Sequence, residues 1–201
     1  MNKVLRHTLP AVLLPIALFI SADLAAAGEK AREDMHYIGL YATTLNHRSI
    51  GEISNEAAWG QVGTLVIGGH ISDLFHAEVR AGGGYKDAKT GDLTLSIDYF
   101  ASWYIGLHYP ITHYANVYAQ TGFSHISGEA ELANFDGDGN GQFRALDGDF
   151  PDSSFSISWL AGLDFEVIDN GYLVFEGGRL FKDTGSGVNT FQFSGGVRYE
   201  F

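Results

Sequence analysis

The stretch Leu93–Tyr109, LTLSIDYFASWYIGLHY, alternates large apolar side chains with smaller or polar ones along its length. Successive side chains of an extended strand point to opposite faces, so a period of two is typical of a β-strand with one apolar face. Asp98 would lie on the more polar face. The apolar face would carry Leu93, Leu95, Ile97, Tyr99, Ala101, Trp103, Ile105, Leu107 and Tyr109.

The same alternation recurs along a chain that has 26 glycines and 13% aromatic residues. It predicts strands at about 35–45, 57–71, 75–86, 93–109, 115–126, 154–167, 171–181 and 189–201. The connections between these strands alternate strictly between short ones and longer, polar ones. Short turns on one side and longer loops on the other are typical of an up-and-down transmembrane barrel. We therefore expect an all-β fold, an eight-stranded antiparallel up-and-down transmembrane β-barrel.

The volume of the lumen indicates which face meets lipid. A soluble barrel of the lipocalin kind would put its apolar face inward, together with Tyr99, Trp103 and many further aromatic side chains. An eight-stranded barrel has an interior only just wide enough for side chains, so the small and polar face fits it better. We therefore expect the apolar face to contact lipid. Only the second strand leaves its faces open, because two apolar pairs of opposite parity compete there, Leu65 and Ile67 against Val62 and Val66.

The N-terminus has the pattern of a secretory signal peptide. Lys3 and Arg6 precede the apolar stretch Leu9–Ile20, and three alanines then supply a small-residue cleavage site. We expect a signal peptide at 1–27 and an outer-membrane barrel domain at 28–201. Without the signal peptide, ten basic and 23 acidic residues remain, which argues against a nucleic-acid partner because phosphate binding needs a basic face. The absence of cysteine excludes a disulfide framework and thiol chemistry.

The C-terminal sequence Gly195–Phe201, GGVRYEF, ends a strand pattern on an aromatic residue. Together with Ser72–Arg80 (SDLFHAEVR) and Glu176–Arg179 (EGGR), it resembles the outer-membrane β-barrel family that includes the OmpA transmembrane domain and OmpX-like proteins. The resemblance implies export to the cell outer membrane, with outer-membrane lipid and lipopolysaccharide as partners. It also implies that barrel-assembly machinery recognises Tyr199 and Phe201.

The face opposite the apolar one carries charged groups that we expect in the lumen: Glu78, Arg80, Asp98, Asp164, Glu166, Glu176, Arg198 and Glu200. An isolated buried charge is very costly, so these groups predict a polar plug of ion pairs and waters. The alternative is a narrow ion path, which would favour cations because acids outnumber bases. Arg179 has outward parity, so it lies above the bilayer unless a bulge at Gly177–Gly178 turns it inward.

The segment Phe135–Gln142, FDGDGNGQ, matches the first half of a calcium-binding loop. Such a loop needs oxygens at positions 1, 3 and 5, a glycine at position 6, a carbonyl at position 7 and a bidentate acid at position 12. The position-12 residue is Asp, which is shorter than the usual Glu, and no helical pattern flanks the segment. A flexible acidic loop is the alternative, and no other cofactor is expected. The expected ligands are Asp136, Asp138, Asn140, Gln142 and Asp147.

His125 and Ser127 support an enzymatic hypothesis. The sequence His-Ile-Ser resembles the His-x-Ser of the lipid A deacylase barrels, whose catalytic residues lie on the lipid side. A nucleophile and its base also need an orienting acid, here Glu129 or Glu131, and Gly128 stands where that family has Asn. The other histidines show no metal-ligand spacing: His36, His47, His70, His76, His108 and His113.

The sequence therefore leaves several hypotheses. We favour a non-enzymatic integral outer-membrane barrel with an envelope-structural role or a surface interaction through its external loops. The alternatives are a lipid A-modifying enzyme of the deacylase kind, a small cation-selective channel and a soluble secreted ligand-binding barrel. No motif identifies the surface ligand.

Overall fold

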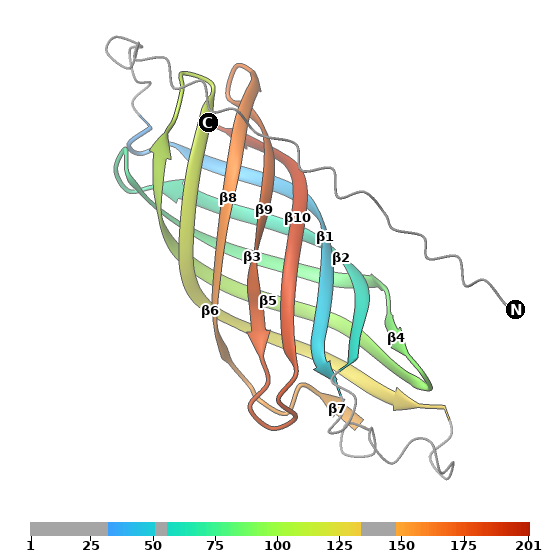
Figure 1. Ribbon diagram of the computed structural model, residues 1–201. Helices are drawn as coiled ribbons and strands as arrows, with labels where there is room; N and C mark the ends of the chain where they lie inside the picture. The colour runs from blue at the N-terminus through green and yellow to red at the C-terminus, as the bar shows by residue number, and fades with distance from the viewer. Residues whose placement is uncertain (1–31, 51–55, 134–147) are drawn as a thin grey trace, which may run out of the picture.

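The computed structural model describes residues 32–50, 56–133 and 148–201, and Figure 1 shows them as a single barrel of strands. Eight long strands build the wall and two short strands extend it: β1 (His36–Ile50), β2 (Glu56–His70), β3 (Phe75–Lys86), β4 (Ala88–Thr90), β5 (Leu93–Pro110), β6 (Ala115–Leu132), β7 (Gly148–Phe150), β8 (Ser156–Ile168), β9 (Gly171–Lys182) and β10 (Asn189–Glu200). In these ranges no helix is long and apolar enough to cross a membrane. The expected signal peptide, 1–27, lies outside the described residues.

Antiparallel pairing closes the barrel all the way round. Each long strand pairs with the next long strand along the chain, and β5 with β6 is one of these pairs. The first and last strands then pair with each other from Tyr37↔Glu200 to Arg48↔Asn189. Among the described residues, each of the eight long strands therefore has a partner on both sides, as a barrel in lipid requires, because no water is present there to satisfy backbone groups. The predicted all-β, eight-stranded antiparallel fold is confirmed.

The two ends of the barrel differ in height. Short turns at 71–74, 111–114 and 169–170 lie at one end, which we call the turn end, together with the paired backbones of His36 and Phe201. At the other end, the loop end, β5 and β6 are 18 residues long. There β4 continues the ladder of β3 along β5, and β7 continues that of β8 along β6. The wall is therefore taller at the loop end than the sequence pattern predicts.

The wall is apolar outside, whereas over most of its height the inside carries small, polar and charged side chains together with several buried tyrosines. Leu107, for example, is 55% exposed on the outer face. In β2, whose faces the sequence left open, Leu65 and Ile67 face outward whereas Val62 and Val66 are buried inside. Val62 belongs to one buried cluster with Leu45 and Phe100, and Val66 belongs to another with several tyrosines. The register of β2 with β1 and β3 sets these faces.

β5 departs from the expected alternation at Asp98. The pairing with β6 skips one residue between Ile97 and Tyr99, which marks a β-bulge. The extra residue reverses the side-chain parity above it, so Leu93 and Leu95 point inward and are buried. Asp98 itself is exposed. The expectations that Asp98 lines the lumen and that the upper apolar residues of β5 face lipid are therefore wrong.

An apolar cluster fills the barrel at the loop end. It buries side chains from several strands and from the short β4 and β7, so the interior changes from polar to apolar along the barrel axis. We call this cluster the apolar cap. Its members are Leu45, Ile50, Ala58, Val62, Ala88, Leu93, Leu95, Ile97, Phe100, Ile126, Ala130, Phe150, Leu180, Phe181 and Val188.

Candidate functional site

Arg80 stands inside the lumen and is fully paired. Its Nε donates to Glu78, and its Nη1 and Nη2 donate to the two oxygens of Glu176, the second at 2.9 Å. Tyr37 Oη donates to Glu78 Oε2 at 2.9 Å, and Tyr118 Oη donates to Glu176 Oε2 at 2.7 Å. All five side chains are buried, and a buried charge is tolerated only with such partners. We call Glu78, Arg80 and Glu176 the central triad.

A second group of ion pairs lies toward the turn end. Glu200 accepts hydrogen bonds from Arg32 Nε at 3.0 Å and Nη2 at 2.5 Å, and it lies 3.2 Å from Arg198 Nη2. Arg198 Nη2 also donates to Asp164 at 2.6 Å, and the other oxygen of Asp164 accepts the Asn116 amide. We call Arg32, Asp164, Arg198 and Glu200 the lower layer. Sequence reasoning missed Arg32, because it precedes the first strand and so belongs to no alternating pattern.

Three histidines from neighbouring strands meet in the lower layer. The ring centroids of His70, His76 and His108 lie 5.4 to 6.2 Å apart. His70 Nε2 lies 3.3 Å from Glu200, and Arg32 contacts the His108 ring. The short turn at 71–74 places His70 opposite His76, so the sequence could have indicated that pair. His108 lies beside the two only because of the register between β3 and β5, which the sequence does not show. In the described part of the chain, no three His, Cys, Asp or Glu side chains are placed to hold a metal ion.

Hydroxyl groups and then the apolar cap fill the lumen above the central triad. Thr43 bonds both Thr64 and Ser194 at 2.9 Å, and Ser102 bonds Ser124 at 2.7 Å. The apolar cap begins above these bonds. Side chains therefore occupy each level of the lumen that the described residues line: ion pairs, hydroxyls and finally hydrocarbon.

The structure separates the expected lumen charges into two groups. Glu166 is half-buried at the turn end, where its Oε1 accepts the Asn170 backbone N–H at 3.0 Å, so it caps the β8–β9 turn instead of joining the plug. Asp98 is exposed at the bulge. The remaining expected charges are buried and ion-paired: Glu78, Arg80, Asp164, Glu176, Arg198 and Glu200.

Arg179 keeps its outward parity. The bulge in β9 lies at Leu180, between the pairs Thr190↔Phe181 and Phe191↔Arg179, and not at Gly177–Gly178. Arg179 therefore lies half-buried on the outer wall, and its Nε is buried without a hydrogen-bond partner.

His125, Ser127 and Glu129 share the outer face of β6, as their spacing implies. His125 Nδ1 lies 2.5 Å from the backbone oxygen of Ser154, and its ring packs against Phe155 with the centroids 5.3 Å apart. Among the described residues, no hydrogen bond joins His125 to Ser127 or Ser127 to Glu129. In this arrangement His125 Nδ1 contacts a backbone carbonyl and not the Ser127 hydroxyl, the contact that a nucleophile and its base would make.

The calcium ligands expected at Asp136, Asp138, Asn140, Gln142 and Asp147 lie outside the described residues, and calcium binding stays a prediction. Tyr199 and Phe201, the residues of the expected assembly signal, are exposed on the outer wall at the turn end, and their recognition by assembly machinery stays a prediction. The backbone of Phe201 pairs with His36 in both directions, at 2.9 and 2.8 Å. The last residue is thus accessible while its backbone helps to close the barrel.

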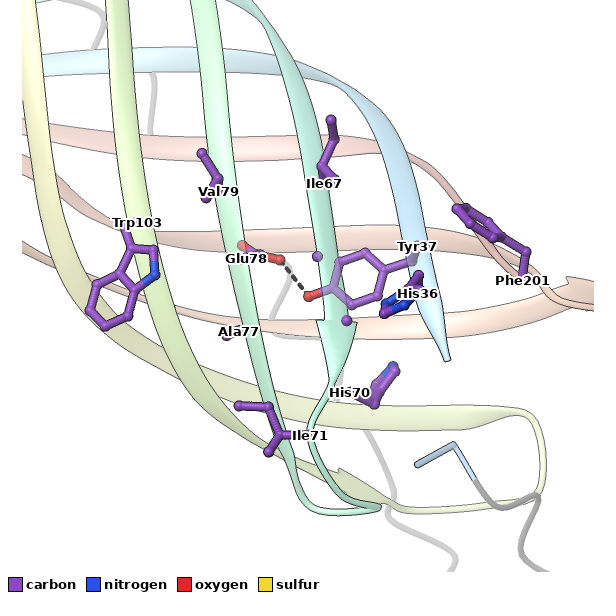
Figure 2. A pocket seen from close by; sticks show the side chains of 12 residues that line it. His36, Tyr37, Ile67, His70, Ile71, Ala77, Glu78, Val79, Trp103 and Phe201 are labelled. Carbon is purple, nitrogen blue, oxygen red and sulfur yellow. Dashed lines mark hydrogen bonds between the residues drawn. The ribbon is translucent and has the colours of Figure 1, made fainter. Parts of the chain in front are cut away.

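A shallow depression of about 570 Å³ lies in the wall near the turn end. Figure 2 shows Ile67, Val79 and Trp103 around it, with the hydrogen bond between Tyr37 and Glu78 on its lumen side. Its floor needs glycine at position 68, because a Cβ there would come within 2.5 Å of the Tyr37 ring. The lining is that of the apolar outer wall, and nothing in it selects a particular ligand.

A protein-family model described as "Outer membrane protein beta-barrel domain" matches residues 11–201. The chain belongs to this family. In such barrels the short turns face the periplasm and the longer loops face outward, so the turn end is the periplasmic end and the loop end is the extracellular end. A comparison with curated protein sequences gives no match.

Solved structures share the fold at low sequence identity. Ail, the attachment invasion locus protein of Yersinia pestis, is 14% identical with a TM-score of 0.54, and the match covers 84% of this chain and 99% of Ail. Neisserial surface protein A is 18% identical with a TM-score of 0.54, over 84% of this chain and 100% of that one. OprG from Pseudomonas aeruginosa is 11% identical with a TM-score of 0.51, over 85% and 97%. At these identities the likeness shows the fold alone.

Proposed function

We propose that this chain is a non-enzymatic outer-membrane barrel with a surface-interaction role through its extracellular end. The filled lumen is the observation that supports this role over transport. Conduction needs a continuous path whose polar groups bind an ion only weakly. Here the charges of the lower layer pair with one another, as do those of the central triad, and apolar side chains fill the lumen above them.

The extracellular end has the height and the charge to meet a partner. β5 and β6 carry the wall upward with β4 and β7, and the segment Ser127–Ser153 contains seven acidic residues and one basic residue. An Ail structure holds the heparin analogue sucrose octasulfate, a polyanion that an acidic surface would repel. We therefore infer a cationic partner or one bridged by calcium.

Deleting residues 134–147 tests this role. The barrel should still show a heat-modifiable band on a gel, because none of its described ladder bonds involves the deleted residues. The wild-type protein in nanodiscs should bind calcium and a polylysine surface, and the deletion should reduce both. Binding that survives the deletion unchanged would contradict the proposal, since the acidic segment would then not be the interacting part.

Two further measurements distinguish this role from the alternatives. If the chain were a lipid A deacylase, His125→Ala and Ser127→Ala would each change the lipid A mass spectrum of cells that express it; we expect no change. If it were a channel, planar-bilayer recordings would show conductance above background; we expect none from the wild-type protein.

A further inference from the structure

Cations on the outer wall are confined to its extracellular end. Among the described residues, the arginines at 32, 80 and 198 are buried in the lumen, and every other Lys or Arg lies on the extracellular half of the wall: Arg48, Lys86, Lys89, Arg179 and Lys182. The exposed charged residues of the periplasmic end are all acidic in that same part of the chain: Glu33, Asp34, Asp73 and Asp169. The extracellular half also exposes acids, among them Asp87, Asp98, Glu129 and Glu131, so within the described ranges the two ends differ in that only the extracellular one presents cations on the wall.

Three of these cations gather where β9, β10 and β1 are neighbours. Lys182 pairs with Asn189, which in turn pairs with Arg48, so only one β10 residue separates the two cations. Their Cα atoms are then about 10 Å apart, since neighbouring strands are spaced by about 4.8 Å. Arg179 lies one step lower on β9, opposite Phe191. We call Arg48, Arg179 and Lys182 the cationic cluster.

Within the described residues, no carboxylate forms an ion pair with the cationic cluster. Arg48 Nε donates to the Asn46 side chain, and its Cζ lies 4.7 Å from the centroid of the Phe191 ring. Arg179 Nε is buried and lacks a hydrogen-bond partner. An arginine supported by an aromatic ring, with donors left over, suits a phosphate, which it can bind through two parallel hydrogen bonds.

Aromatic side chains fix the height of this cluster at the membrane surface. Trp159 pairs with Arg179 across the β8–β9 ladder. Trp59 and Phe193, on the strands to the other side, lie with their ring centroids 6.2 Å apart. Aromatic girdles mark the membrane–water interfaces of outer-membrane barrels. Cations at this height meet lipid headgroups from the side.

We propose that the cationic cluster binds the phosphates of lipid A, the phosphorylated glycolipid of the outer leaflet. Arg179 and Arg48 would each offer a guanidinium to phosphate oxygens, and Lys182 would add a point charge above them. The Nε–H of Arg179, which has no hydrogen-bond partner among the described residues, would then donate to a phosphate oxygen. This inference concerns the lipid-facing wall and not the loops, so it stands or falls independently of the surface-interaction role.

Lipid binding by the purified protein in detergent, measured by native mass spectrometry, tests the proposal. The test variant is Arg48→Gln, Arg179→Gln and Lys182→Gln together; the matched control is Lys86→Gln with Lys89→Gln, which removes exposed cations from another part of the same end. The test variant should bind bis-phosphorylated lipid A at least tenfold more weakly than wild type, and the control should change less than twofold. Both should keep the heat-modifiable band of a folded barrel.

Two further arms identify the chemistry and its source. The wild-type protein should bind dephosphorylated lipid A at least tenfold more weakly than the phosphorylated form. Arg179→Lys, which keeps the charge but loses the two-bond geometry, should fall between wild type and the triple variant. The proposal is overturned if the control loses as much binding as the test variant, if phosphate removal changes nothing, or if the variant loses phosphatidylglycerol and not lipid A.

Discussion

Arg80 holds two carboxylates inside the lumen, so its replacement leaves them without a counter-charge. We expect Arg80→Met to lower the free energy of unfolding by about 3–5 kcal/mol, the usual cost of removing one partner from a buried ion pair. Urea titration of the folded band in detergent measures this. Adding Glu78→Gln and Glu176→Gln should recover much of the loss, because the network is then neutral. If Arg80→Met alone is as stable as Lys89→Met, whose parent side chain is exposed, the central triad does not hold the lumen as argued.

Asp183 organises the extracellular end outside the membrane-spanning strands. Burial alone would raise the pKa of this carboxyl, but hydrogen bonds from Ser186 and Ser153, including Ser153 Oγ at 2.8 Å, outweigh burial and hold its pKa below the ordinary value of 3.8. A group with a lowered pKa in the folded state stabilises above its ordinary pKa, and this stability is lost as the pH falls through the lowered value.

We therefore expect protease resistance of the loop that joins β9 to β10 to be constant from pH 7 to about pH 4 and to fall at lower pH. Asp183→Asn should cost about 1–3 kcal/mol near neutral pH, since it turns an amide donor toward N–H and O–H donors. It should also remove the acid-dependent step. Limited proteolysis with an acid-stable protease follows both effects. An unchanged acid step in the variant would assign the pH dependence to another group.

Individual residues show where sequence parity suffices and where it fails. Glu78, Arg80 and Glu176 follow the period of two, so their inward direction was predictable from the sequence. Their mutual contacts were not, because β3 and β9 are brought face to face only by closure of the barrel. Arg32 lies outside the strands, so no alternating pattern could predict that its side chain points into the lumen.

Among the elements, β5 shows how one bulge residue changes which side chains of the upper half of a strand face inward. Its apolar pattern continues past Asp98 without a break, so the sequence alone predicted one face throughout. The bulge makes the upper half face inward, where Leu93 and Leu95 join the apolar cap. A bulge has no dependable sequence signature here, since the residue concerned is an ordinary Asp within an alternating run.

Deleting Asp98 should therefore remove the bulge and leave the upper half of β5 facing the same way. Ile97 would then directly precede Tyr99 on the opposite face, so Leu93 and Leu95 would stay in the apolar cap. We expect the heat-modifiable band to persist, and β4 and the upper β5 to keep their protection from hydrogen exchange. Asp98→Ala is the matched control, because it keeps the residue count and hence the bulge. Protection lost in the deletion and kept in the control would mean that the extra residue is itself needed to hold these leucines inside.

For the whole molecule, the alternation of short and long connections predicted the strand count and the closed barrel correctly. It did not predict that the wall continues above the membrane or that its interior turns apolar there. Both depend on β4 and β7, which are only three residues long and leave too little pattern to recognise. The consequence is a lumen blocked by two chemistries in series, one ionic and one apolar.

Barriers in series give a specific electrical prediction. Arg32→Ala with Arg80→Ala should loosen the ion-pair layers and let water reach the freed carboxylates, yet the intact apolar cap should keep planar-bilayer current at background. Phe100→Ala with Phe181→Ala should open the cap, yet the intact ion pairs should again block current. Only the combination of all four should conduct, and it should favour cations because the uncompensated lumen charges are then carboxylates. The heat-modifiable band checks that each variant is folded, and current through either double variant would show that its remaining layer is not a barrier.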